Sequence, residues 1–441
     1  MTSRTVIMLG LRKPKDTQEH TGSYYAASAN WQTNYPLLKG AHKADVVVVG
    51  GGFTGVNTAL ELAERGYSVV LLEANRISWG ATGRNGGQII GGIGHSLECF
   101  EKRIGKEGVR SIYDMGVEAC DIIRERVDKY NIDCDLTWGY CDVALKARHM
   151  REFEAEKAYQ EKMGYPHTLE LLNSDQLQSE LRSDLYVGGM LNRTGNGHCH
   201  VLNLCLGEAK AAESLGVKLF ERSRVTKVVQ GDAPAVHTDQ GVVQAQHVVL
   251  CGNAYLDDLV PKIASKVLPS NSSVIVTEPL SKAQAEALMP GNRAVCDPRT
   301  ALDYYRLSAD RRLLFGGLSN YTGREPNNLQ GVMREKMLKV FPQLEDARID
   351  YGWSGQMGIG MNRMPQLGRL KGNVYYIQAY SGHGVAPTHM MGRITAQMIA
   401  GQAERFDVFG KIKHWSFPGG KLLRTPSFAL GMMYYKLLDE L

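Results

Sequence analysis

One short segment of the chain combines residue types that can bind the phosphates and ribose of a dinucleotide. The apolar run 46–49 is typical of a strand buried on both faces, and Gly50-Gly51-Gly52-Phe53-Thr54-Gly55 follows it directly. Glycines at this spacing permit a tight turn, close approach of a pyrophosphate and close packing of the next helix, whose N-terminus attracts phosphate. Glu73 lies where a ribose-binding acid is expected. We therefore predict a dinucleotide site, against the alternative of an ordinary glycine-rich turn, at Gly50, Gly52, Phe53, Thr54, Gly55, Glu73 and Ala74.

The elements that must position this site alternate between strand and helix. Residues 53–65 have helical spacing of apolar residues and end at Gly66, a common helix terminator, and 68–73 is the next expected strand. The nucleotide-binding sheet is expected to continue with a helix at 200–216, strands at 217–220 and 225–229, two strands within 242–251, and a strand at 374–380. Val225 and Gly252 belong to these returning segments and are included among the candidate cofactor-binding residues.

A long polar loop at 76–94 follows the second strand. Long loops within compact domains are usually functional, although a plain surface loop is the alternative. Arg84 can neutralise a phosphate, and the backbone N–H groups of Gly86 and Gly87 can reach flavin oxygens. The candidate cofactor-binding residues of this loop are Gly80, Thr82, Arg84, Asn85, Gly86, Gly87 and Gln88.

A second strand–glycine–helix unit occurs near the end of the chain, with a strand at 374–380, a loop at 381–387 and a helix at 389–400. Two such turns suggest two ends of one extended cofactor, and a helix dipole near a flavin stabilises the charge of its reduced form. This favours FAD over NAD, although another structural turn is the alternative. The residues involved are Gly382, His383, Gly384 and Val385.

The composition excludes several other classes of function. The net charge of +5, from 51 basic and 46 acidic residues, is too mild to indicate a nucleic-acid or anionic-membrane partner. No run of 18 apolar residues is present, so no membrane span is expected. The eight cysteines show no metal-binding spacing, which predicts reduced thiols, no metal site and a cytoplasmic location. Residues 1–15 read as a native extension rather than a signal peptide.

Several of these motifs resemble the FAD-dependent D-amino acid oxidase superfamily, which includes sarcosine and glycine oxidases. The resemblance rests on the runs 50–55, 80–88 and 380–385. A closer similarity, to the branch that oxidises gamma-glutamylated polyamines such as gamma-glutamylputrescine, rests on 23–30, 84–88, 362–370 and 417–420. It implies oxidation of a C–N bond to an imine, with hydride passing to flavin N5, hydrolysis to an aldehyde, and reoxidation by oxygen or another acceptor.

The resemblance also implies the fold class, which is α/β with an α+β substrate part. A Rossmann-like FAD-binding domain is expected to be discontinuous, comprising 16–97, 190–267 and 351–405. The substrate domain, on a mixed sheet, is expected to comprise 98–189 and 268–350, and residues 406–441 a C-terminal helical tail. Residues 98–182 read as an inserted helical part with a short β-like segment at 137–145, and 268–350 as β-rich with a helix at 328–340.

Departures from the family pattern narrow the substrate. Amino-acid-oxidising relatives carry an Arg that pairs with the substrate carboxylate, and Met357 stands at that position in Trp353-Ser354-Gly355-Gln356-Met357. An amine whose carboxylate is absent or distant is therefore favoured. No Cys follows Cys296, so FAD is expected to be non-covalent.

Four residues are candidates for the catalytic site. Arg306 can serve a distant glutamyl carboxylate, with a strand-edge Arg as the alternative. Tyr304 and Tyr305 can wall an apolar amine pocket, although at most one can face the flavin, since adjacent strand residues point in opposite directions. His383 is expected near the flavin ring, where an N–H donor or cation stabilises reduced flavin. The functional alternatives are a glycine, sarcosine or D-amino-acid oxidase or dehydrogenase and, less favoured, a tRNA-modifying flavoprotein.

Overall fold

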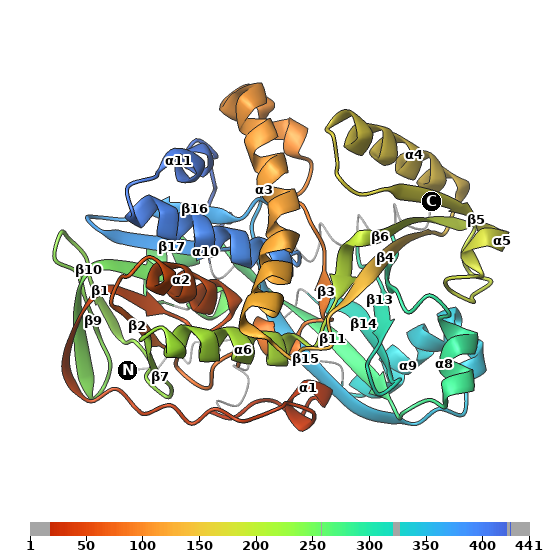
Figure 1. Ribbon diagram of the computed structural model, residues 1–441, viewed down its shortest axis with the longest axis horizontal. Helices are drawn as coiled ribbons and strands as arrows, with labels where there is room; N and C mark the ends of the chain where they lie inside the picture. Colours follow the sequence, from red (N-terminus) through yellow and green to blue (C-terminus); the bar gives the residue numbers. More distant parts are fainter. Residues whose placement is uncertain (1–17, 257, 321–326, 421–423, 425–441) are drawn as a thin grey trace, which may run out of the picture.

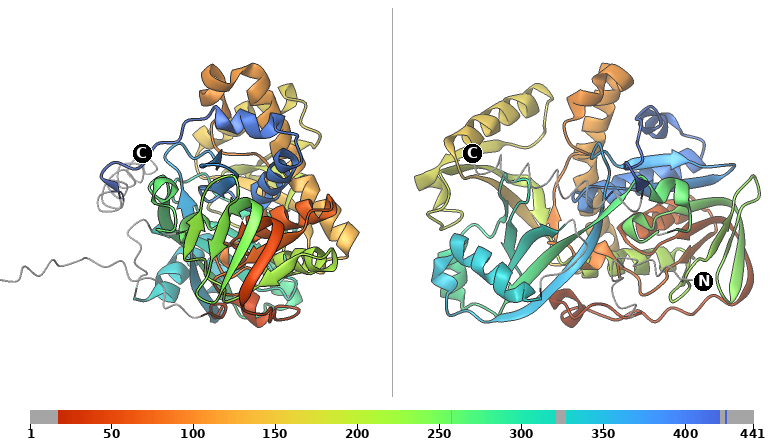
Figure 2. Two further views of the ribbon diagram at one scale, coloured as in Figure 1. Left: turned by 90° about the vertical axis from the view of Figure 1, so that its left-hand side faces the viewer. Right: turned by 180° about the vertical axis from the view of Figure 1, so that it is seen from behind.

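Two β-sheets lie side by side, with a long helix standing between them (Figure 1). The computed structural model describes residues 18–256, 258–320, 327–420 and 424. The first sheet contains the predicted glycine turns. The second sheet is mixed, and helices cover its outer face (Figure 2). This arrangement confirms the predicted fold class, an α/β nucleotide-binding part joined to a part built on a mixed sheet.

The first sheet is parallel over most of its width. Its strand order is β16 (Gln366–Arg369), β17 (Val374–Gln378), β10 (Gly241–Leu250), β1 (Gly40–Val49), β2 (Val69–Leu72) and β7 (Lys218–Phe220). Only β16 is antiparallel to its neighbour along this path. Two short strands, β8 (Lys227–Val229) and β9 (Ala235–His237), extend from β10. The apolar run of β1 is fully buried from Val46 to Val48, as expected for a strand covered on both faces.

The prediction of two strands within 242–251 is wrong. Residues 241–250 form the single strand β10, which pairs with β1 from Gly241 to Leu250. Backbone pairing to β1 carries the strand through the polar residues Gln244 and Gln246. The three-residue strand β9 was not predicted, because so short a segment has no measurable periodicity.

The second sheet has the order β15 (Ile349–Ile359), β11 (Leu268–Thr277), β14 (Leu313–Asn320), β13 (Tyr304–Leu307), β12 (Ala294–Cys296), β4 (Thr137–Ala144), β6 (Gly188–His198) and β3 (Gln88–Ile89). Strand β5 (Leu169–Asn173) pairs with β6. Helices α8 (Lys282–Leu288) and α9 (Leu329–Val340) cover one face. Strands β6 and β15 cross the boundaries at 190 and 351, so the two-domain division stays a proposal.

The expected inserted helical part contains two long helices, α3 (Glu101–Tyr130) and α4 (Ala147–Lys162), but its β4 and β5 belong to the second sheet. Near the chain end, α10 (Val385–Ile399) begins at the glycine turn itself rather than at 389. Pro387 suggested a loop, yet proline is tolerated in the first turn of a helix. Helix α11 (Glu404–Gly410) begins before the expected tail at 406–441, and the terminal helix expected there stays a prediction, because residues 421–423 and 425–441 lie outside the described residues.

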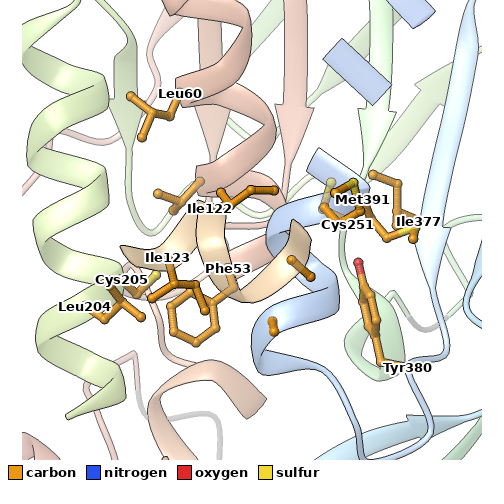
Figure 3. Packing of buried hydrophobic residues seen from close by; sticks show 14 of the residues in the cluster. Phe53, Leu60, Ile122, Ile123, Leu204, Cys205, Cys251, Ile377, Tyr380 and Met391 are labelled. Atoms are coloured by element: carbon orange, nitrogen blue, oxygen red, sulfur yellow. The ribbon is translucent and has the colours of Figure 1, made fainter. Parts of the chain in front are cut away.

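Four helices pack together against the first sheet (Figure 3). Phe53 and Leu60 of α2 (Phe53–Glu64) lie among side chains of α3, α10 and α6 (Val201–Ser214). Ile122 and Ile123 come from α3, and Met391 comes from α10. All of these side chains are buried. The start of α2, which carries the first glycine turn, is therefore held by apolar packing on several sides.

A buried network of charges joins the same four helices. Glu61 of α2 pairs with Arg126 of α3 at 2.7 Å and with Arg393 of α10 at 2.9 Å. Glu208 of α6 pairs with His389 of α10 at 2.9 Å. Burial alone would raise the pKa of Glu61, but Arg126 and Arg393 lower it below its usual value. Buried ion pairs add specificity to helix packing more reliably than they add stability.

Within the part of the chain that the structure describes, no helix has both the length and the apolar composition needed to cross a bilayer.

Gly55→Ala is expected to lower the free energy of unfolding by about 3 kcal/mol, because the new Cβ would collide with backbone. A Cβ at Gly55 would lie 1.8 Å from the carbonyl oxygen of Gly50. Gly410→Ala is the matched control, since nothing lies within 4 Å of its Cβ position. Thermal and denaturant unfolding of both variants measures the effect. Equal stability of the two would contradict the packing described for α2 and β1.

Candidate cofactor and substrate site

The carboxyl ends of three parallel strands meet at one edge of the first sheet. Val49 of β1 pairs with Leu250 of β10, and Leu250 pairs with Tyr376 of β17. The segments that leave this edge are the first glycine turn, Gly252-Asn253, and the second glycine turn. Ligands of open α/β sheets bind at this edge. Regions more than 300 residues apart in the sequence are thus adjacent, and the hydroxyls of Thr54 and Tyr380 are 2.9 Å apart.

The first glycine turn has the geometry of a phosphate-binding turn. Gly50 has φ +112°, a conformation that L side chains rarely adopt. Gly52 occupies the N-cap of α2 and has no side chain of its own to cap this terminus. Phe53 N–H donates to Thr82 Oγ1 at 3.0 Å. The start of α2 therefore presents backbone and a positive dipole end to a ligand.

Glu73 closes the turn from the neighbouring strand. Its carboxylate accepts hydrogen bonds from Gly51 N–H at 2.7 Å and from Asn75 N–H at 2.8 Å. Burial raises the pKa of Glu73, while these two backbone donors lower it. Ala74 connects Glu73 to this second donor. The acid is thus fixed beside the glycine turn, in the position that a ribose-binding group requires.

The loop at 80–88 folds back over the first turn. Asn85 organises it, since its Nδ2 donates to Thr82 O at 2.8 Å and its Oδ1 accepts from Gly87 N–H at 2.9 Å. Arg84 lies over the Trp79 ring at 4.2 Å, and its carbonyl accepts from Trp353 Nε1 at 2.9 Å. Gly80 precedes the short 3-10 helix η1 (Ala81–Arg84), and Gln88 enters β3, where its Nε2 donates to Val295 O at 2.9 Å. The loop therefore bridges the two sheets.

The second glycine turn lies on the other side of this loop. Ser381 and Gly382 have positive φ, and Gly384 occupies the N-cap of α10 without any side-chain cap. His383 Nε2 lies 2.9 Å from the carbonyl oxygen of Ile90, so this nitrogen carries the proton as donor. Burial lowers the pKa of His383, so its ring is neutral at pH 7. Val385 is the first residue of α10.

The structure separates the two neighbouring tyrosines. Tyr305 points into the core on the outer face of the second sheet, where it stacks on Phe315 at 5.6 Å and its hydroxyl bonds to Tyr186. Tyr304 points to the opposite face, against the 80–88 loop, where a Cβ on Gly86 would lie 2.2 Å from its ring. Tyr304 is therefore the tyrosine brought to the candidate site.

Arg306 is neither at the surface nor open to a ligand. It is 3% exposed, and its guanidinium donates to Gly86 O at 2.8 Å, Cys199 O at 2.8 Å and Tyr25 Oη at 3.1 Å. A further bond reaches Leu307 O at 3.1 Å. The planar fork thus clamps the 80–88 loop to the end of β6 and to α1 (Tyr24–Ala27). This geometry gives Arg306 a positioning role.

Met357 borders the second glycine turn. A Cβ on Gly382 would lie 3.3 Å from the sulfur of this uncharged side chain. Two other predicted cofactor-binding residues, Val225 and Gly252, make their contacts elsewhere. Val225 packs against the apolar cluster of the first sheet that also contains Phe220, and Gly252 packs against Leu256.

Sequence reasoning missed two residues of this region. Asn253 Oδ1 accepts from Ala379 N–H at 2.9 Å and so ties β10 to the second glycine turn. The carbonyl of Ile90 holds His383. The position of Asn253 directly after a strand and a glycine was a usable signal. The role of Ile90 had no such signal, because any residue type supplies a backbone carbonyl.

These features fit an FAD molecule. Two helix N-termini with glycine at the N-cap face one sheet edge, the half-buried Glu73 lies beside the first, and a glycine loop covers both. Gly52, Phe53 and Thr82 are placed to hold pyrophosphate, and Glu73 the adenosine ribose. The 80–88 loop and the 382–385 turn are placed to hold the flavin end.

The fold and site define a flavin-dependent oxidoreductase of two-sheet architecture. Solved structures with this fold include L-proline dehydrogenase from P. horikoshii (TM-score 0.68, 21% identity, 84% of this chain and 98% of that one). Another is glycine oxidase from Geobacillus kaustophilus (TM-score 0.68, 18% identity, 82% and 95%).

The chain belongs to the DAO family of FAD dependent oxidoreductases, which it matches over residues 45–398. FAD is therefore its cofactor. It is 45% identical to gamma-glutamylputrescine oxidoreductase of Escherichia coli K12 over 96% of this chain and 99% of that protein. It is 43% identical to the probable oxidoreductase OrdL of Haemophilus influenzae, over 96% and 98%.

Gly52→Val is expected to yield protein largely free of FAD, because the side chain fills the surface at the start of α2. A Cβ at Gly52 would already lie 2.9 Å from Thr82 Oγ1. The measurement is the flavin absorbance of purified protein relative to absorbance at 280 nm. Gly22→Val is the control, since Gly22 is exposed and has nothing within 4 Å. A variant that stays fully yellow would count against the assignment.

Arg306→Lys is expected to lower the free energy of unfolding by about 3 kcal/mol and to accelerate FAD release, because an ammonium cannot reproduce the fork that holds three segments. Thermal unfolding and flavin fluorescence after dilution measure the two effects. Arg348→Lys, at an exposed arginine, is the control. Unchanged FAD release in Arg306→Lys would show that the clamp does not organise the 80–88 loop.

Proposed function

We propose that this enzyme oxidises a C–N bond of a gamma-glutamylated amine, such as gamma-glutamylputrescine, to an imine that water converts to an aldehyde. The observation that carries the proposal is the 45% identity to gamma-glutamylputrescine oxidoreductase over nearly the full length of both chains. The uncharged Met357 beside the second glycine turn supports it, because an α-amino acid would find no arginine there.

Bound FAD supplies the two-electron acceptor for this oxidation. The chain's own residues provide the surroundings. An alkylammonium must lose its proton before its C–N bond is oxidised, and an apolar wall that contains Tyr304 favours the neutral amine. His383 is neutral, so we assign it orientation of the 90–91 backbone and hydrogen bonding near the flavin end, in place of a cationic role.

Three further features belong to the proposal. FAD is held non-covalently, since no Cys follows Cys296 in the sequence. Oxygen is the electron acceptor that regenerates the enzyme. The enzyme works in the cytoplasm on a small-molecule amine. An amino-acid oxidase is the second candidate, which the shared fold with glycine oxidase favours, although an identity of 18% shows the fold alone.

A substrate screen separates the two candidates. The purified enzyme is expected to produce peroxide with gamma-glutamylputrescine at a kcat/KM at least about 100-fold above that with glycine, sarcosine or D-alanine, since a missing charge partner costs several kcal/mol. Aldehyde formation is measured in parallel, because it reports turnover of the amine independently of peroxide.

Anaerobic photometric reduction of the bound flavin provides the control for the acceptor. If gamma-glutamylputrescine bleaches the flavin but no peroxide forms in air, the proposal of oxygen as the electron acceptor is contradicted. The proposal of gamma-glutamylputrescine as the substrate is then retained. Bleaching by glycine or sarcosine alone would contradict the proposed substrate.

A further inference from the structure

A row of side chains crosses the second sheet on the face that carries Tyr304. Met190 of β6 is paired with Asp142 of β4, Asp142 with Cys296 of β12, and Cys296 with Tyr304 of β13. Paired residues of neighbouring strands point to the same face. Asp142 therefore shares the face of Tyr304 and lies two strands away from it in the sheet.

Packing contacts connect Asp142 with the flavin end of the site. Tyr140, Ala294 and Cys296 form a small buried cluster, against which the side chains of Ile90 and Tyr304 pack. Tyr140 also donates its hydroxyl to Asp142 Oδ1 at 2.9 Å. The carbonyl of Ile90 in turn binds His383. One layer of side chains thus separates the carboxylate from the second glycine turn.

Asp142 is half-buried, and it differs from the buried acids in having no cation beside it among the described residues. Ion pairs with Arg or Lys neutralise six of them, Glu61, Glu180, Glu208, Glu221, Asp297 and Asp303. The half-buried Glu73 accepts two backbone N–H groups. Among the residues that the structure describes, the side chain of Asp142 bonds only to Tyr140, and the nearby charged group, Glu156 of α4, is also acidic.

The carboxylate of Asp142 is desolvated, although the residue as a whole is not sealed from solvent. Burial raises the pKa of Asp142 to about 7, and Glu156 adds to the rise. The residue nevertheless retains accessible surface, and so is half-buried rather than sealed. A desolvated carboxylate without a partner is costly, and a cationic ligand removes that cost. The environment therefore suits an ammonium group brought by the substrate.

The separation also matches the proposed substrate. Two strand spacings place Asp142 about 10 Å from Tyr304 across the sheet. In gamma-glutamylputrescine roughly nine bonds separate the reacting carbon from the α-amino nitrogen, equivalent to three residues of extended backbone or about 10 Å. The α-ammonium can therefore reach Asp142 while the reacting carbon lies at the Tyr304 end.

We propose that Asp142 binds the α-ammonium of the gamma-glutamyl head and thereby selects gamma-glutamylated amines over shorter diamines. This inference rests on the proposed function. Asp142 acts in recognition, at the end of the substrate remote from the oxidised bond, and Tyr140 positions its carboxylate. Putrescine itself is too short to place one amine at Asp142 and the other at the Tyr304 end.

The test combines a change in the enzyme with a matching change in the substrate. Asp142→Asn and the wild type are compared on gamma-glutamylputrescine and on glutarylputrescine, which has the same length and carboxylate but lacks the α-amino group. Loss of the ammonium is expected to lower the wild-type kcat/KM at least about 30-fold, through KM, as for a buried charge pair. Asp142→Asn is expected to lose a similar factor on gamma-glutamylputrescine and to discriminate less than about threefold between the two compounds.

Several controls keep the outcomes distinct. Asp175→Asn removes an exposed carboxylate from α5 (Ser174–Leu177) of the same sheet region and should retain wild-type discrimination. If Asp142→Asn does not fold, Tyr140→Phe, which frees Oδ1, should alter KM for gamma-glutamylputrescine more than for glutarylputrescine. Wild-type enzyme that uses both compounds equally, or full discrimination in Asp142→Asn, overturns the assignment of Asp142. Failure of the wild type on both compounds overturns the proposed function instead.

Discussion

The parallel pairing of β17, β10, β1 and β2 is the constraint on which the site depends. It brings the ends of strands from distant parts of the sequence to one edge, so that two glycine turns and the Asn253 segment face one volume. Each turn alone would be an unremarkable strand-to-helix connection. Their adjacency, fixed by backbone hydrogen bonds and by the Thr54–Tyr380 contact, produces a site long enough for a dinucleotide with a flavin at one end.

Buried polar groups hold this edge in register with the second sheet. The Glu61 and Glu208 network connects α2, α3, α6 and α10 behind the glycine turns. Arg306 connects the second sheet with the 80–88 loop in front of them. The charge network and the Arg306 hydrogen bonds both join segments that are far apart in the sequence. Removal of one residue from either would leave its polar partner buried without a hydrogen bond. The orientation of the two sheets is thereby coupled to the geometry of the cofactor loop.

The local patterns predicted most of what lies within one strand–turn–helix unit. The first glycine turn, β13, α9 and the acid at 73 follow from spacing and periodicity. Sequence reasoning failed where the outcome depends on distant partners. Backbone pairing with β1 made 241–250 one strand, and the acceptors around Arg306 turned an expected substrate ligand into a clamp. The opposite orientations of Tyr304 and Tyr305 were predictable from strand geometry, but which of them faces the cofactor loop was not.

The distribution of charged and uncharged side chains around the substrate region indicates how the two ends of the proposed substrate are distinguished. At the second glycine turn the sequence supplies Met357, so a charged head group gains nothing by lying next to the reacting carbon. Two strands from Tyr304 it supplies Asp142, a carboxylate for which the described residues provide no cation. A neutral reacting end and a charged distant end are what an enzyme needs if its substrate must lose a proton at one amine and keep it at another. The second sheet carries both environments two strands apart, so one rigid sheet provides a neutral surrounding for the reacting amine and a charged partner for the distant one.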